Sequence, residues 1–134
     1  MPKNEDAVLV KCNAAAVQGI DAIGVTVEVM ATKGFLTTMV GLPDTAVKES
    51  NERIHSALTA CGYSYPRRKL VVNLAPADVR KEGSAFDLPI ALGILGADRQ
   101  IPADVLEQFV VMGELSLDGT LLPVKGILPM AIMA

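Results

Sequence analysis

Ser84 has the setting best suited to chemistry in this sequence, because it stands at the expected start of an apolar helix. Such a serine can act as a nucleophile when a desolvated lysine lies within hydrogen-bond reach and helix-end N–H groups can bind an oxyanion. The same position suits capping, since Ser84-x-x-Asp87 fits a capping box and Asp87 puts negative charge at the positive helix end. Pro89, which a helix tolerates only in its first turn, favours Asp87 itself as the cap. The residues alone leave both interpretations open.

A second candidate site is the basic run Arg67-Arg68-Lys69, in the loop expected before a central strand. Lysine and arginine side chains neutralise phosphates, and Arg80 and Lys81 in another loop can add to the same surface. Tyr63 and Tyr65 can stack on bases. These five basic residues are therefore the candidate DNA contacts. The alternative is a solvated loop beside a strand, which the formal net charge of −3 supports.

Other common sites are missing from the sequence. It has neither the Gly-x-x-x-x-Gly-Lys-Ser/Thr pattern that cradles phosphates nor the Gly-x-Gly-x-x-Gly pattern of dinucleotide sites. The lone histidine, His55, falls on the polar face of an expected helix without neighbours suited to a metal or a triad. Cys12 and Cys61 are far apart, which indicates two reduced cysteines rather than a disulfide or metal site. We expect no metal and no cofactor in this chain.

Composition limits the class of protein. The 134 residues fit one domain, 1–134, and 51% of them are apolar, which argues against disorder. No apolar run approaches the roughly 20 residues that cross a bilayer, and no signal-peptide pattern follows Met1, so we expect a cytoplasmic protein without membrane contact. The net charge argues against a nucleic-acid binder that uses its whole surface, but it leaves room for a local basic patch.

The pattern of the first half predicts three strands and a helix. We expect a strand at 7–13, and Val25, Val27 and Val29 alternate with Thr26, Glu28 and Met30 as in a half-buried strand. A turn at 32–34 and a return strand at 35–40 would close a hairpin with it.

A helix should follow, with Asp44 as N-cap and Gly62 just past its end. Its expected buried face is formed by Val47, Ile54, Leu58 and Cys61. Two i,i+4 charge pairs are expected on its polar face, namely Lys48/Glu52 and Glu49/Arg53.

The second half predicts a buried sheet centre and a hairpin. Residues 70–74 form a continuous apolar run typical of a central strand, and a helix covered with apolar residues should run to about Ala97. A short helical turn is expected at 103–108. Asp118-Gly119 suits a type I′ turn between strands at 109–117 and 120–124. A last apolar helix should begin near Ile127. The fold class is therefore α/β (α+β), a mixed sheet with helices on one face.

The segment from Gly113 to Ala134 resembles the part of Lon-type serine-lysine peptidases that carries the catalytic lysine, and Ser84 falls on the serine position. The lysine position, however, holds Leu128, and Lys125 lies three residues earlier, where those peptidases have glycine. The resemblance thus implies a dismantled dyad, which weighs against peptidase activity without removing it as an alternative.

Three longer segments, 40–50, 72–78 and 84–94, resemble the N-terminal domain of the magnesium-chelatase-related AAA+ ATPases, the ComM/YifB family. That resemblance implies a Lon-like domain of the ribosomal-protein-S5 domain-2-like type. It also implies an ATPase module after Ala134, with ATP and Mg²⁺ bound there, a homo-hexamer, and DNA processing such as branch migration in natural transformation.

Three functions remain open from the sequence. The chain can be a non-catalytic accessory domain of such an ATPase, contacting single-stranded or branched DNA or assisting ring assembly. It can be a serine-lysine peptidase that uses Ser84. It can also be a purely structural protein–protein interaction module.

Overall fold

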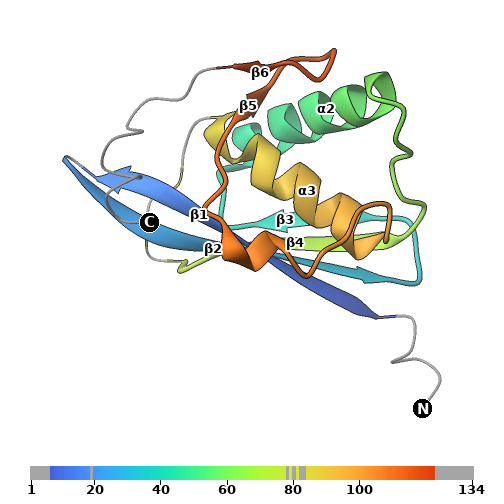
Figure 1. The fold of residues 1–134 in the computed structure, drawn as a ribbon, viewed down its shortest axis with the longest axis horizontal. Helices are drawn as coiled ribbons and strands as arrows, with labels where there is room; N and C mark the ends of the chain where they lie inside the picture. Colours follow the sequence, from blue (N-terminus) through green and yellow to red (C-terminus); the bar gives the residue numbers. More distant parts are fainter. Residues whose placement is uncertain (1–6, 19, 78, 80, 82–83, 123–134) are drawn as a thin grey trace.

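A four-stranded mixed sheet forms the base of the molecule (Figure 1). The computed structural model describes residues 7–18, 20–77, 79, 81 and 84–122. The strands are β1 (Val8–Gln18), β2 (Asp21–Thr32), β3 (Thr37–Val40) and β4 (Lys69–Ala75), in the spatial order β1-β2-β4-β3. The neighbours β1 and β2, and likewise β2 and β4, run antiparallel, whereas β3 runs parallel to β4. The predicted mixed sheet is confirmed.

The hairpin of this sheet is β1–β2, not the predicted pairing of residues 25–30 with residues 35–40. β1 continues past the predicted end at Asn13, and its pairing with β2 extends from Val8↔Ala31 to Gln18↔Asp21. β3 pairs with β4 instead, with Thr37 opposite Leu70. The prediction was wrong because it paired consecutive strands. The unit β3–α2–β4, with α2 the intervening helix (Asp44–Ala60), is the strand–helix–strand succession that places parallel strands side by side.

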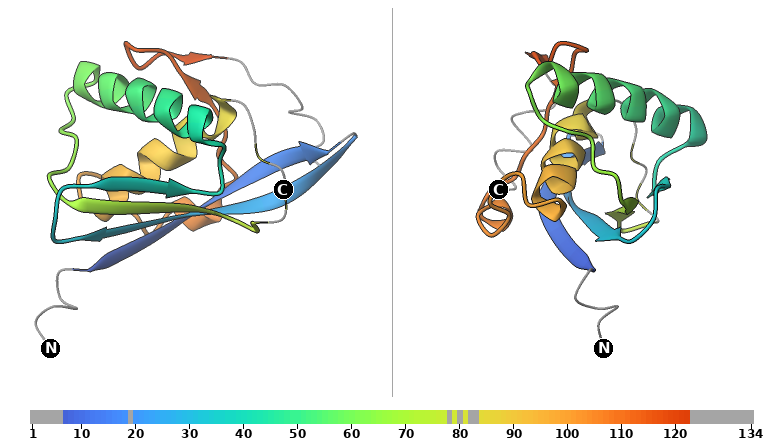
Figure 2. Two further views of the ribbon diagram at one scale, coloured as in Figure 1. Left: turned by 180° about the vertical axis from the view of Figure 1, so that it is seen from behind. Right: turned by 90° about the vertical axis from the view of Figure 1, so that its right-hand side faces the viewer.

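Two helices lie on one face of this sheet, α2 and α3 (Asp87–Ala97) (Figure 2). The buried face of α2 consists of Ser50, Ile54, Ala57 and Leu58. Of the four residues expected there, Val47 is half-buried and Cys61 is exposed. Arg53, which was expected on the polar face, is half-buried and forms hydrogen bonds to Asp87 of α3.

The helix starts differ from the predicted caps. Asp44 is the first residue of α2 rather than its N-cap, which is Pro43. A short 3-10 turn (Ser84–Phe86) precedes α3, whose N-cap is Phe86 with no side-chain cap bond. The capping box of Ser84 with Asp87 is therefore wrong, and so is Asp87 as the cap. The predicted end of α2 is confirmed, since Gly62 has a φ of 86°.

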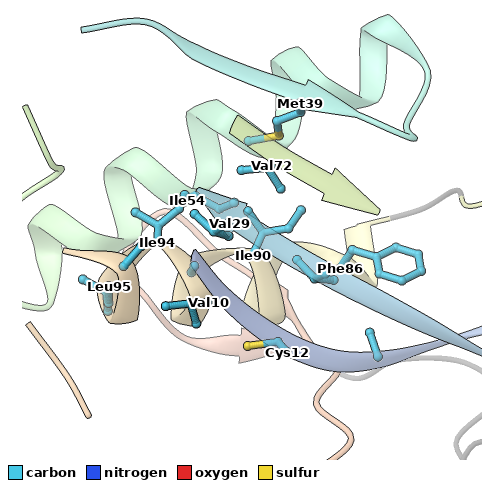
Figure 3. Packing of buried hydrophobic residues seen from close by; sticks show 14 of the residues in the cluster. Val10, Cys12, Val29, Met39, Ile54, Val72, Phe86, Ile90, Ile94 and Leu95 are labelled. Atoms are coloured by element: carbon cyan, nitrogen blue, oxygen red, sulfur yellow. The ribbon is translucent and has the colours of Figure 1, made fainter. Parts of the chain in front are cut away.

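The core fills the space between the sheet and the two helices (Figure 3). Val29 and Val72 of the central strands face Ile54 of α2 and Ile90 and Ile94 of α3 in this layer, and all five are fully buried. Cys12 belongs to the same layer, where burial raises the pKa of its thiol to about 11. The predicted alternation of β2 is confirmed, because Val25, Val27 and Val29 are buried while their neighbours are not.

A second hairpin covers the helix pair. It consists of β5 (Glu114–Leu115) and β6 (Leu121–Leu122), so its strands are shorter than predicted. Gly119 has a φ of 90° but Asp118 does not have a positive φ, which excludes the predicted type I′ turn. The Ser116 N–H donates to Thr120 and the Gly119 N–H to Ser116, so the loop has three residues and glycine takes the left-handed position.

The helical turn predicted at 103–108 is present at Leu106–Gln108. The predicted last helix near Ile127 lies outside the described residues.

The predicted class, α and β elements with a mixed sheet, is thus confirmed, while the closer likeness to Lon and to ribosomal protein S5 stays a prediction. Across the described ranges, every helix is too short or too polar to span a lipid bilayer.

Candidate nucleic-acid interface

Ser84 lies at the turn that leads into α3, and its hydroxyl donates a hydrogen bond to the carboxylate of Glu114 in β5. The bond ties the start of α3 to the second hairpin. Lys125 and Leu128, the two residues on which the dismantled dyad depends, lie outside the described residues. The interpretation of Ser84 as a former nucleophile therefore stays a prediction.

Asp87 is a buried carboxylate that joins three elements. It is 1% exposed and accepts hydrogen bonds from Ser50 Oγ at 2.7 Å, from Arg53 Nε at 2.6 Å and Nη2 at 3.0 Å, and from the Leu115 N–H at 3.2 Å. The hydrogen bond to Asp87 raises the pKa of Arg53. Arg53 thus turns toward α3 rather than toward Glu49, its predicted partner. With both oxygens accepting, Asp87 holds α2, α3 and β5 together.

The five predicted DNA contacts do not form one surface. Lys81 is 2% exposed, and its ammonium donates to the carbonyls of Pro76 at 2.5 Å and Val79 at 2.7 Å. Its ammonium is therefore bound within the loop after β4 and is not part of the exposed surface. Arg80 lies outside the described residues. Arg67 and Lys69 are exposed and Arg68 is half-buried, with a long 3.5 Å contact to the Ala31 carbonyl.

The structure brings other charges to Arg67 and Arg68. A surface groove of about 750 Å³ lies between three loops, and it is lined by Val8, Lys33, Gly34, Phe35, Arg67, Arg68, Asp98 and Arg99. Four of these residues are basic and one is acidic, in a chain whose net charge is −3. The carboxylate of the acidic one, Asp98, accepts a hydrogen bond from Gln100. Positive charge is thus concentrated here.

Arg99 holds its place in the groove at a conformational cost. The N–H of Arg99 donates to Gly96 and that of Gln100 to Leu95, which is the Schellman motif that ends α3. The left-handed position of this motif usually holds glycine, yet here it holds Arg99 with a φ of 61°. Among the described residues other than glycine, only Arg99 has a positive φ.

The aromatic residue at the groove is not one of the two predicted tyrosines. The Tyr65 ring stacks on His55 with centroids 4.4 Å apart, and its hydroxyl donates to Asn51 at 3.1 Å. Burial raises the pKa of Tyr65. Its ring already stacks on His55, so that face is closed to a base. Tyr63 is not part of the groove lining, whereas Phe35, 89% exposed, is. An apolar residue directly after the Lys33-Gly34 turn was the sequence signal for it.

In the ranges that the structure describes, no three His, Cys, Asp or Glu side chains gather as a metal site would require. Cys12 is buried and Cys61 is exposed, both as free thiols. The groove is the described surface at which four basic side chains gather, so its charge suits an anionic ligand.

Comparisons with known proteins agree with the resemblance carried by residues 40–50, 72–78 and 84–94. The family model described as subunit ChlI of Mg-chelatase matches residues 27–134. Over 120 residues the chain is 47% identical to the uncharacterized protein YifB of Escherichia coli and 48% identical to the competence protein ComM of Haemophilus influenzae. An uncharacterized protein of Mycobacterium bovis is 42% identical over the same length.

Each of these alignments covers 89% of this chain but only 23–24% of the relative. The chain thus spans about a quarter of the length of the curated relatives it matches. None of the three relatives is named as a peptidase, so the comparisons do not favour the peptidase alternative for Ser84. By the extent of the family match and the identity to these relatives, the chain belongs to the magnesium-chelatase-related ComM/YifB family.

Proposed function

We propose that this chain is a non-catalytic accessory domain of an AAA+ ATPase that processes DNA, and that it supplies a DNA-contacting surface. The observation that carries the proposal is the gathering of Lys33, Arg67, Arg68 and Arg99 from three separate loops around one groove. The name of the competence protein ComM, a 48% identical relative, supports a link to DNA uptake or processing. ATP, Mg²⁺ and a hexameric ring belong to the longer cytoplasmic protein in this proposal.

Phosphate contacts leave a measurable salt signature. Each neutralised phosphate releases counterions, so the logarithm of the binding constant falls with the logarithm of the salt concentration by about 0.7 per contact on a single strand. The groove is short and open, which predicts weak binding that is strong enough to measure at low salt. Ring assembly through the same face is the alternative use of this surface, and it would not show this dependence on DNA.

We expect Arg67→Ala/Arg68→Ala to weaken binding of a labelled oligonucleotide about tenfold at low salt and to reduce the salt slope by about 1.4. Fluorescence anisotropy between about 50 and 200 mM salt measures both quantities. Lys11→Ala/Lys48→Ala removes the same charge from exposed positions outside the groove lining and is the matched control. Equal affinity of the Arg67/Arg68 variant and the unaltered chain, or an equal loss in the control, contradicts the proposed surface.

Arg99→Gly is expected to change stability and binding in opposite directions. Glycine removes the left-handed strain of an L residue at the end of α3, which should raise the free energy of unfolding by about 0.5–1 kcal/mol. The lost guanidinium should weaken oligonucleotide binding several-fold and reduce the salt slope by about 0.7. Urea denaturation and anisotropy measure the two effects. A variant that is more stable and binds DNA unchanged would remove Arg99 from the proposed surface.

A further inference from the structure

Phe35 is the most unusual residue of the groove, because an aromatic ring that is 89% exposed gains nothing from folding. Its position is nevertheless well defined. The carbonyl of the next residue, Leu36, accepts a hydrogen bond from the Leu70 N–H at 2.9 Å, and β3 begins at Thr37. The Phe35 ring is therefore displayed two residues before a paired strand begins.

The turn before Phe35 is also tightly placed. Gly34 has a φ of 141°, and a Cβ there would lie 3.0 Å from Cβ of Lys69. The loop thus lies directly against β4 beside the basic run, where only glycine fits easily. Phe35 is held next to the cationic side chains by the sheet.

From this arrangement we propose that the groove selects nucleic acid with unpaired bases, and that a base stacks on Phe35 while Lys33, Arg67 and Arg99 hold the flanking phosphates. The proposal rests on the proposed function and names its substrate class. A positively charged groove combined with an exposed aromatic ring is the usual arrangement for sequence-tolerant binding of single strands. In a duplex the base faces are stacked on one another and are closed to Phe35. An acidic peptide would satisfy the charges but would leave the ring unused.

The test compares three labelled ligands of equal length, namely a thymidine single strand, an abasic strand and a duplex, on the 134-residue chain. We expect tighter binding of the thymidine strand than of the abasic strand. Phe35→Ala should weaken binding of the thymidine strand about five- to tenfold and leave the affinity for the abasic strand unchanged. The matched control is Phe109→Ala, since Phe109 is 61% exposed and is not among the groove residues. Circular dichroism melts confirm that both variants stay folded.

The outcomes separate the two proposals. If Phe35→Ala binds all three ligands as the unaltered chain does, while Arg67→Ala/Arg68→Ala still loses affinity, then stacking is wrong and the DNA surface stands. If no ligand binds with a salt dependence, both proposals fail. Competition by polyglutamate as effective as that by the thymidine strand would also overturn the stacking proposal, because it would show a site for any polyanion.

Discussion

Asp87→Ala is expected to lower the free energy of unfolding by about 3–5 kcal/mol. Removing one partner of a buried ion pair leaves the other charge without compensation. Here the loss is larger than one pair, since Ser50, both bonding nitrogens of Arg53 and the Leu115 N–H lose their acceptor together. Partial exposure of the Arg53 side chain, at 22%, lets water solvate the guanidinium and places the expected value toward the lower end of the range.

Urea denaturation of three further variants separates these contributions. Ser50→Ala removes one donor and should cost about 1–2 kcal/mol. Arg53→Met with Asp87→Leu replaces the pair by apolar side chains and should cost less than Asp87→Ala alone. Asp104→Ala, at an exposed position, is the control and should stay within about 0.5 kcal/mol. A loss for Asp87→Ala no greater than for Asp104→Ala would mean that Asp87 does not hold these elements together.

Local patterns explain the parts of the fold that the sequence predicted. The alternation in β2 reflects the one covered face of the sheet, and the apolar run of β4 reflects its place between two other strands; both patterns are visible within a few residues. Gly62 was found because a helix end needs one residue of positive φ. The partner of β3 was not found, because pairing depends on where a whole helix returns the chain. The strand–helix–strand order was the available signal for that parallel pair.

The candidate site was predicted only where it is continuous in the sequence. Arg67 and Arg68 are adjacent in the sequence, were named as candidates and line the groove, whereas Lys33, Phe35 and Arg99 join them only through folding. Lys81 shows the reverse error, because its charge suggested a surface but two backbone carbonyls bind it in the interior. Arg53 and Asp87, 34 positions apart, were assigned to a helix face and a cap for the same reason. Charge and residue type do not reveal which distant group will accept the hydrogen bond.

Gly41→Ala is expected to cost about 2–4 kcal/mol, because two separate penalties add at this residue. Its φ of 102° strains any L side chain, and a Cβ there would lie 2.6 Å from the Leu74 carbonyl oxygen of β4. Gly62→Ala is the matched control. It has a similar φ of 86° but nothing within 4 Å, so it should cost only about 1 kcal/mol.

Urea denaturation gives the free energy of unfolding of both variants. The difference between them reports the penalty of the close approach to β4 at the point where the chain leaves β3 for α2. Gly41 directly follows β3, whereas Phe35 precedes the start of that strand, and Gly41 does not line the groove. The folded fraction of Gly41→Ala should therefore bind the thymidine strand as the unaltered chain does. If the two glycine variants lose equal stability, the close approach to Leu74 is not what requires glycine at position 41. If Gly41→Ala loses affinity while fully folded, β3 transmits the strain to Phe35, and the two ends of this short strand cannot be treated as independent.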